Sequence, residues 1–129
     1  MTSEKLNPAT MAPPVGSFSH GVLAPGAGHW LHVSGQLGLR PDGTLAEGFT
    51  EQARMAWENL MAVLAAANMD ETHLVKVTTF MTDAADLKDL NPVRSGFLKS
   101  ARPASTLLIV KALARPEWLI EVEAVAHRD

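Results

Sequence analysis

The alternation of apolar and polar positions is clearest over residues 48–68, where apolar side chains recur at the three- and four-residue spacing of one buried helical face. The apolar positions of this face are Phe49, Ala53, Ala56, Trp57, Leu60, Val63, Leu64 and Ala67. Charged residues such as Glu51, Arg54 and Glu58 fall on the other side. The pattern predicts an amphipathic helix, and Asn68 is a typical residue to end it.

Shorter segments rich in β-branched and apolar residues are predicted to be strands. These segments are residues 18–24, 30–36, 73–81, 104–111 and 118–126. The turn sequence at 25–28 predicts a hairpin between the first two strands, and the short segment 112–117 predicts an antiparallel hairpin between the last two. Residues 40–43, Arg-Pro-Asp-Gly, predict a tight turn, because proline presets φ and glycine can take a positive φ.

A second helix is predicted after the middle strand, with its start set by Asn91 and Pro92. Asparagine is a favoured N-cap and proline is tolerated at the first helical position. We therefore expect a turn over residues 84–90 and a helix from Pro92 to about Lys99.

The order of these elements predicts a single α+β domain over residues 1–129, with two helices on one face of a mixed sheet of about six strands. The opposite face of such a sheet would carry apolar side chains that nothing in the same chain covers. Burial of that face against other copies of the chain is the simplest remedy, so we expect a homo-oligomer.

Composition narrows the classes of function. The 129 residues include no cysteine and no tyrosine, and carry 11 Lys and Arg against 14 Asp and Glu. The lack of cysteine excludes a disulfide scaffold, a Cys-ligated zinc site and a thiol nucleophile. A net charge of −3 without a basic cluster argues against a nucleic-acid partner. With no signal-like or membrane-spanning apolar run, we expect a cytoplasmic protein without a membrane partner.

The most suggestive chemistry lies in the last predicted strand, where Glu121 and Glu123 fall on one face. One interpretation is a polar stripe that faces solvent. The other is a carboxylate on a rigid strand that orients or deprotonates water. His29 and His32 have an H-x-x-H spacing, but no third ligand completes a metal site, so we interpret them as ordinary strand and loop residues.

Several strings, in order and at the right spacing, resemble the RidA/YjgF family. They are PVGSFSH (14–20), LHVSGQ (31–36), PDG (41–43), AWENL (56–60), VLAAA (63–67), LVKVT (74–78), TD (82–83), RPAST (102–106), LARP (113–116) and IEVEAVA (120–126). The resemblance implies a chorismate-mutase-like fold and a homotrimer with clefts between its subunits. It also implies hydrolysis of reactive enamines and imines, such as 2-aminoacrylate, to ketoacids and ammonia, with no metal or organic cofactor.

The resemblance carries over to individual positions only in part. Glu121 corresponds to the glutamate that the family uses to activate water, and Asn91 to an asparagine that lines the cleft, although an N-cap role would also explain Asn91. Ser34 and Gly35 belong to a retained Ser-Gly-Gln string. Two positions differ: Phe18 stands where an aromatic residue, commonly tyrosine, is expected, and Ser105 stands where the family has a substrate-binding arginine.

Serine at 105 supplies one neutral hydroxyl in place of a charged, bidentate group. We therefore expect a catalytic Glu121 and a substrate-binding set of Phe18, Ser34, Gly35, Asn91 and Ser105, acting on an imine or enamine outside the archetypal range. The alternative is a trimer that binds a small metabolite without turning it over. Ribonuclease activity, also associated with parts of the family, receives no support from the charge balance.

Overall fold

The long amphipathic segment forms helix α1 (Gly48–Ala66), in a computed structural model that describes residues 4–6, 9, 17, 19, 21–23 and 26–129. Asn68 follows the helix with φ of 58°, which confirms its predicted role at the C-terminal end. The predicted turn before the helix is also confirmed, because Gly43 has φ of 88° and donates its N–H to the Arg40 carbonyl oxygen at 2.8 Å.

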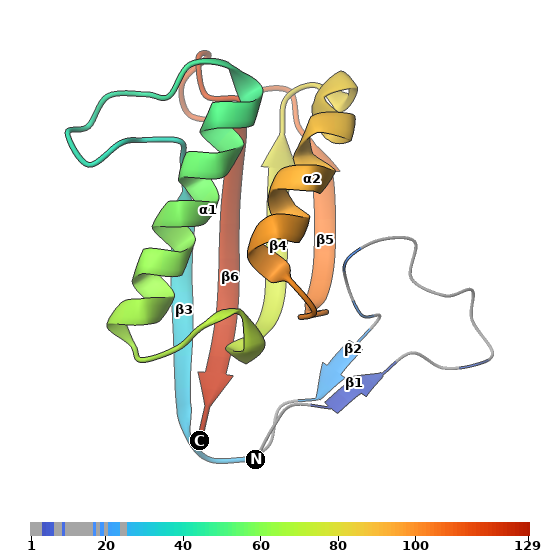
Figure 1. Cartoon of the computed structure of the whole chain (residues 1–129). Coiled ribbons are helices and arrows are strands. Elements are labelled where there is room, and N and C mark those ends of the chain that lie inside the picture. Colours follow the sequence, from blue (N-terminus) through green and yellow to red (C-terminus); the bar gives the residue numbers. More distant parts are fainter. Residues whose placement is uncertain (1–3, 7–8, 10–16, 18, 20, 24–25) are drawn as a thin grey trace.

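A four-stranded sheet lies beneath the helices, in the order β3-β6-β4-β5 (Figure 1). Its strands are β3 (His29–Gln36), β4 (Leu74–Met81), β5 (Ala104–Ile109) and β6 (Ile120–Arg128). Strand β6 pairs antiparallel with both β3 and β4, whereas β4 and β5 are parallel. The mixed α+β sheet is confirmed, but within the described residues it holds four strands where about six were predicted.

The predicted hairpin between the last two strands is wrong, because β5 pairs with β4 and not with β6. Helix α2 (Leu87–Leu98) connects β4 to β5, and a helical crossover between neighbouring strands produces a parallel pair. Residues 110–119 then carry the chain past the end of β4, where Val110 N–H donates to the Met81 carbonyl at 2.7 Å. Strands β5 and β6 follow one another in the sequence but are not neighbours in the sheet, because β4 lies between them.

The predicted hairpin between the first two strands is also wrong. Strand β2 (Gly21–Leu23) pairs with β1 (Glu4–Leu6) in a separate two-stranded sheet, and β3 pairs with β6. The main-sheet partner of β3 is therefore the far end of the chain. The pairing of β3 with β6 places β6 between β3 and β4 in the sheet. Contacts between such distant segments decide it, and local turn sequences carry no information about them.

Helix α2 begins at Leu87, so the prediction of a helix start at Pro92 with Asn91 as its N-cap is wrong. A preceding 3₁₀ turn, η2 (Ala84–Asp86), is capped by Asp83, whose Oδ1 accepts the Ala85 N–H at 2.9 Å. Pro92 stands inside α2, although it cannot donate the usual helical hydrogen bond. Leu90 and Val93 are buried on either side of it, and this packing holds the helix across the proline.

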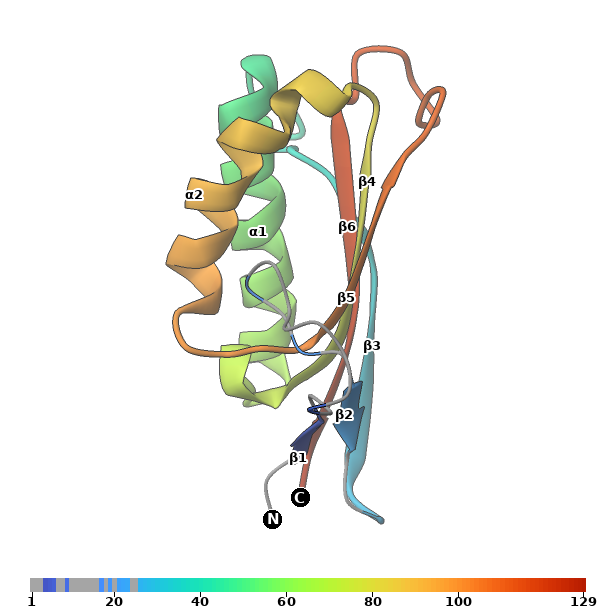
Figure 2. The ribbon, with the colours of Figure 1, turned by 90° about the vertical axis from the view of Figure 1, so that its right-hand side faces the viewer.

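Both helices cover the same face of the sheet and leave the other face bare (Figure 2). The sheet contributes Val33, Val77, Met81, Ile120, Val122, Ala124 and Ala126 to the core between the two layers. Helix α1 contributes Phe49, Ala53, Ala56, Trp57, Leu60 and Leu64, and α2 contributes Leu90, Val93 and Leu98. The Trp57 and Phe97 rings stack between the two helices with centroids 6.0 Å apart. We call the face without helices the open face.

Helix α1 also fixes the loops at one end of the sheet. The buried Gln52 amide accepts the Leu119 N–H at 2.9 Å and donates to the Glu117 carbonyl at 3.2 Å. The Asn59 amide donates to the Leu37 and Leu39 carbonyl oxygens at 3.0 and 2.9 Å. These bonds hold the chain directly after β3 and directly before β6. None of the helices in the described residues is both long enough and apolar enough to cross a membrane.

Gly38 should be required for this close packing. A Cβ at Gly38 would lie 2.6 Å from Gln52 Cα, which is backbone and cannot swing away, so we expect Gly38→Ala to lower the free energy of unfolding by about 1–3 kcal/mol. Gly96 in α2 is the matched control: a Cβ there meets nothing within 4 Å, and Gly96→Ala should raise stability by about 0.5–1 kcal/mol. Urea denaturation of both variants measures the difference, and equal effects would contradict the assignment.

Candidate functional site

The site begins at a β-bulge in β3. Val33 is opposite Ala124 and Gln36 is opposite Val122, so Ser34 and Gly35 together face the single residue between those partners on β6. A bulge of this kind bends the strand and redirects nearby side chains, and bulges are common beside active sites. Asn59 holds the chain just beyond the bulge through the Leu37 carbonyl.

The bulge brings Gly35 directly against the side chain of Glu121. A Cβ added to Gly35 would overlap Glu121 Oε2 and would lie 2.6 Å from its Cδ and 2.9 Å from its Cγ. The glycine is therefore needed for space: the glutamate side chain occupies the volume that any other residue at 35 would fill. Gly35 and Glu121, which were selected separately in the sequence, therefore lie in contact.

Glu121 points to the open face, because its neighbours Ile120 and Val122 are fully buried against the helices. It is partly buried, and its cross-strand partner on β4 is Phe80. Within the described residues, its carboxylate forms no hydrogen bond and no ion pair. A carboxylate held in this way, beside an aromatic ring and with its oxygens unused, can accept a proton from water or orient it.

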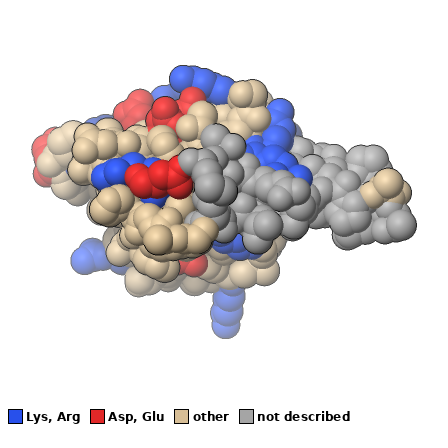
Figure 3. All heavy atoms as spheres, turned by 90° about the horizontal axis from the view of Figure 1, so that it is seen from below, with Lys and Arg blue, Asp and Glu red and all other residues tan. Residues whose placement is uncertain are grey.

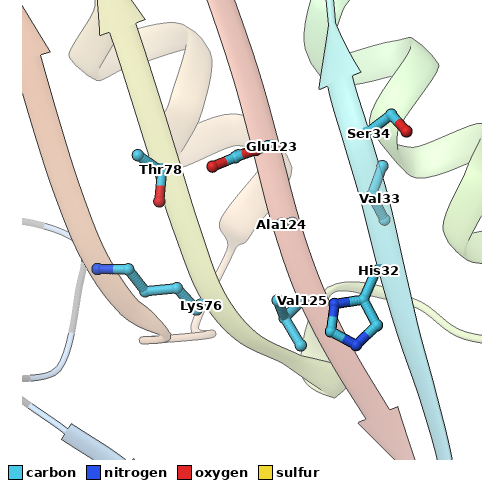
Figure 4. A pocket seen from close by; sticks show the side chains of 8 residues that line it. All are labelled: His32, Val33, Ser34, Lys76, Thr78, Glu123, Ala124 and Val125. Carbon is cyan, nitrogen blue, oxygen red and sulfur yellow. The ribbon is translucent and has the colours of Figure 1, made fainter.

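Glu123 lies on the same open face, as the strand alternation predicted, but in different surroundings. Its cross-strand partner is Thr78, and both line a shallow hollow of about 360 Å³ on the open face. Figure 4 shows the residues around this hollow on β4, β6 and β3; Lys76, Thr78 and Glu123 project away from the helices, whereas Val33 and Ala124 belong to the core. Ser34 lies at the rim of this hollow, and Lys76 donates to Thr106 Oγ1 at 2.5 Å. Glu121 is not among the residues that line it.

Ser105 lies on the opposite side of the sheet. It pairs with Val77, which is 2% exposed and packs against the helices, so Ser105 also faces the helix layer from the edge strand β5. Strand β4 lies between Ser105 on β5 and Glu121 on β6, and the two side chains face opposite sides of the sheet. One chain therefore does not bring Ser105 and Glu121 together.

Asn91 also belongs to the helix layer. It is exposed on α2, and its Oδ1 accepts a hydrogen bond from Arg94 Nη2 at 2.8 Å. Phe18 lies outside the described residues. Its neighbours in the sequence are described: Ser17 Oγ is 3.3 Å from Ser95 Oγ on α2, and Ser19 N–H donates to the Pro103 carbonyl at 2.9 Å.

The candidate residues therefore fall into two groups. Ser34, Gly35 and Glu121 form the bulge group on the open face. Asn91 and Ser105 form the edge group, on α2 and on the helix-facing side of β5. Among the described residues Gly35 and Glu121 are in contact, whereas the two groups lie on opposite sides of the sheet. Among the described residues, no cluster of three or more histidines or carboxylates could hold a metal ion.

Arg94 donates a hydrogen bond to Asn91 and is counted here with the edge group, although it was not selected from the sequence. Burial lowers the pKa of its guanidinium, because desolvation disfavours the charged form. Its signal was available: Arg94 is four residues after Leu90 and four before Leu98, in an apolar helical stripe. The incorrect helix start at Pro92 concealed this stripe.

Comparison with known proteins assigns the architecture to a family. The sequence model of the family described as Endoribonuclease L-PSP matches residues 9–128. A RutC family protein of Aquifex aeolicus is 38% identical over 116 residues, which cover 87% of this chain and 90% of that protein. The chain belongs to the RidA/YjgF family.

Further relatives agree with this membership. A human protein named 2-iminobutanoate/2-iminopropanoate deaminase is 33% identical over 87% of this chain and 80% of its own length. A crystal structure of YyfB from Yersinia pestis, a Rid family protein described as of unknown function, superposes with a TM-score of 0.89 at 33% identity, covering 99% of this chain and all of that one. RidA from an Antarctic Psychrobacter gives a TM-score of 0.74 at 29% identity, covering 97% and 99%.

The Gly35–Glu121 contact can be tested by a double-mutant cycle. Gly35→Ala forces the Glu121 side chain out of its position, and we expect it to lower the free energy of unfolding by about 1 kcal/mol in the natural background. All the overlapping atoms lie beyond the Cβ of Glu121, so in a Glu121→Ala background the same change should have almost no effect. Urea denaturation measures both steps, and an equal loss in the two backgrounds would show that the contact is not the cause.

Proposed function

We propose that the protein hydrolyses small imines or enamines to carbonyl compounds and ammonia, in clefts between the subunits of a homotrimer. The observation that carries the proposal is the Glu121 carboxylate, fixed over Gly35 on the open face with no partner among the described residues. A rigid strand, a glycine that leaves room and an unused carboxylate meet the geometric requirement for a general base. The name of the human relative, a deaminase of 2-imino acids, supports the same chemistry.

The proposed reaction uses water and Glu121 alone to move protons. The Glu121 carboxylate accepts a proton from a water molecule while the water oxygen bonds to the imine carbon. The protonated Glu121 then returns that proton to the nitrogen. The hydroxyl proton next passes through the carboxylate to the same nitrogen, so the C–N bond breaks with release of ammonia as the carbonyl forms. The products are a ketone or ketoacid and ammonia, and the carboxylate is regenerated. An enamine enters the same sequence after it tautomerises to the imine.

The trimeric cleft is proposed because, in one chain, the bulge group and the edge group lie too far apart to act on one substrate. Trp30 and Leu108 are 49% and 45% exposed on the open face, where large apolar side chains favour contact with another copy. Packing around the open face would set the bulge group of one copy beside the edge group of its neighbour. A closed arrangement of three copies satisfies this head-to-tail contact.

RNA is not the favoured substrate. The chain has a net charge of −3, and on the end of the molecule seen in Figure 3 the basic and acidic side chains are interspersed. A protein that holds a phosphate backbone needs several Lys or Arg contacts in one stripe. We therefore propose a small-molecule substrate.

Glu121→Gln should abolish the proposed reaction while Glu123→Gln should not. The glutamine cannot accept a proton, so we expect ammonia release from freshly generated 2-iminopropanoate, or from larger and neutral imines, to fall by about 100-fold or more. Glu123 is on the same strand and the same face but lies in the hollow beside Thr78, so its variant is the matched control and should stay close to the natural rate.

Three outcomes would contradict the proposal. If none of the imines is hydrolysed faster than in buffer, the protein is not this enzyme. If a metabolite binds saturably without being altered, the non-catalytic binding trimer is correct. If both glutamine variants lose activity equally, Glu121 has no special role.

Formation of the trimer should depend on the apolar side chains of the open face, and not on exposed apolar side chains elsewhere. Leu108 and Ile109 are adjacent in β5 and are 45% and 47% exposed, but Leu108 pairs with Phe80 on the open face and Ile109 pairs with the buried Met81 on the other. We expect the natural protein to have three times the chain mass by light scattering. Leu108→Asp should reduce it towards the monomer, and Ile109→Asp should not. A natural protein that is monomeric at micromolar concentration would refute the shared cleft.

A further inference from the structure

Arg94 occupies an apolar stripe of α2 that faces the sheet. Leu90 and Leu98, one helical turn before and after it, are 0% and 1% exposed, so the stem of Arg94 leaves the helix on its buried side. Ser95, the next residue, lies beside Ser17, and Asn91 is exposed on the same side of the helix. The guanidinium therefore lies at the border between the helix layer and the surface, in the edge group defined above.

The guanidinium of Arg94 uses few of its hydrogen-bond donors. Nη2 donates to Asn91 Oδ1 at 2.8 Å, whereas Nε is buried with no partner. Within the part of the chain that the structure describes, no carboxylate lies within 4.0 Å of it. Arginine has five N–H donors and stays protonated at neutral pH. A positive charge is thus partly withdrawn from water without a counter-charge, which proteins tolerate only where something else compensates for it.

Arg94 differs from the other five arginines in one respect: its Nε is buried and has no hydrogen-bond partner within the described residues. Each of the other five has an identifiable partner, either a carboxylate, a carbonyl or hydroxyl oxygen, or an aromatic ring. The pairs are Arg40 with Thr44 and the Leu45 carbonyl, Arg54 with Glu51, Arg102 with the Lys99 and Ala101 carbonyls, Arg115 with the Trp118 ring, and Arg128 with the Ala67 carbonyl. Arg94 is also the arginine whose pKa burial lowers.

The hydrogen bond that Arg94 donates to Asn91 suggests how the guanidinium is used. It holds Nη2 against Asn91 Oδ1, while Nε is buried on the side of the helix layer. Nη1 has no hydrogen bond within the described residues and is not enclosed. The two Nη groups therefore present a paired set of donors towards the surface, which is the geometry that a carboxylate matches with its two oxygens.

We propose that Arg94, positioned by Asn91, binds the carboxylate group of the substrate. This inference rests on the proposed function and narrows its substrate class to small 2-imino acids, whose carboxylate is attached directly to the carbon that water attacks. Because Arg94 and Glu121 lie on different layers of one chain, the carboxylate is held by one copy and the water is activated by the Glu121 of a second copy. Ser105, on the helix-facing side of β5, adds one hydroxyl near the same edge.

The test is direct binding of the expected products of such substrates. Pyruvate and 2-oxobutanoate are titrated into the natural protein by calorimetry at low ionic strength, with pyruvamide as the uncharged analogue. We expect saturable binding of both acids and binding of pyruvamide at least about tenfold weaker. Arg94→Met should weaken pyruvate binding by about tenfold or more while leaving the weak pyruvamide binding unchanged. Arg54→Met, which removes a surface arginine from α1, is the matched control and should bind pyruvate normally.

Two further variants keep the test decisive if Arg94→Met fails to fold. Arg94→Lys retains the charge but loses the paired donors, and Asn91→Leu retains the guanidinium but releases it. Each should weaken pyruvate binding several-fold while thermal denaturation shows a folded protein. A structural role alone would not change the preference for pyruvate over pyruvamide, so that ratio is the decisive readout.

The inference is overturned if the natural protein binds pyruvamide as well as pyruvate, or if Arg94→Lys and Asn91→Leu bind pyruvate normally. It is also overturned if inorganic phosphate displaces pyruvate at similar concentrations, since the site would then be a general anion site. Ammonia release separates this outcome from failure of the proposed function. Carboxylate binding through Arg94 without turnover leaves the inference intact and refutes the enzyme, whereas unchanged hydrolysis of 2-imino acids by Arg94→Met refutes the inference alone.

Discussion

The burial of one face of β6 is the constraint on which the rest of the molecule depends. Ile120, Val122 and Ala124 pack against the helices from the centre of the sheet, so the residues between them must point to the other side. A shift of one residue would bury both glutamates in the core and expose the apolar row, which the energy of burying a charge forbids. The position of Glu121 therefore follows from the packing of its neighbours. The rigidity that the catalytic hypothesis requires of Glu121 comes from the same core packing.

A second local feature turns this exposed glutamate into a site. Without glycine at position 35, beside the bulge in β3, a side chain would fill the volume that the Glu121 carboxylate occupies. The bulge itself is held from behind, because Asn59 of α1 binds the carbonyl groups directly after it. Helix α1 therefore contacts the chain beside the bulge, and the bulge contacts the Glu121 carboxylate. A change in the packing of α1 would act on Glu121 through these two contacts.

The division of the candidate residues between two layers is the reason for proposing a cleft shared by two copies. The bulge group supplies a proton acceptor without a cation, and the edge group supplies the Arg94 guanidinium, which has no carboxylate partner among the described residues. These two deficits are complementary, and assembly would remove both while it covers Trp30 and Leu108. Opposite charges on separate surfaces also favour the pairing of unlike edges over that of like edges.

The sequence by itself determined the elements whose signals are local: helix α1 with its end at Asn68, the turn at Gly43, strand β4, the shared face of Glu121 and Glu123, and the family that the motifs indicate. The periodicity of apolar side chains depends only on residues close together in the sequence, so these features can be predicted without knowing which distant segment they contact. Strand order, the parallel pairing of β5, the bulge and the face of Ser105 were decided by tertiary structure, because each depends on contacts between distant segments. The start of α2 belongs to the same group. Local capping rules favoured Asn91 and Pro92, but burial of Leu90 and Val93 outweighed them, and that packing is what placed Arg94 at the edge.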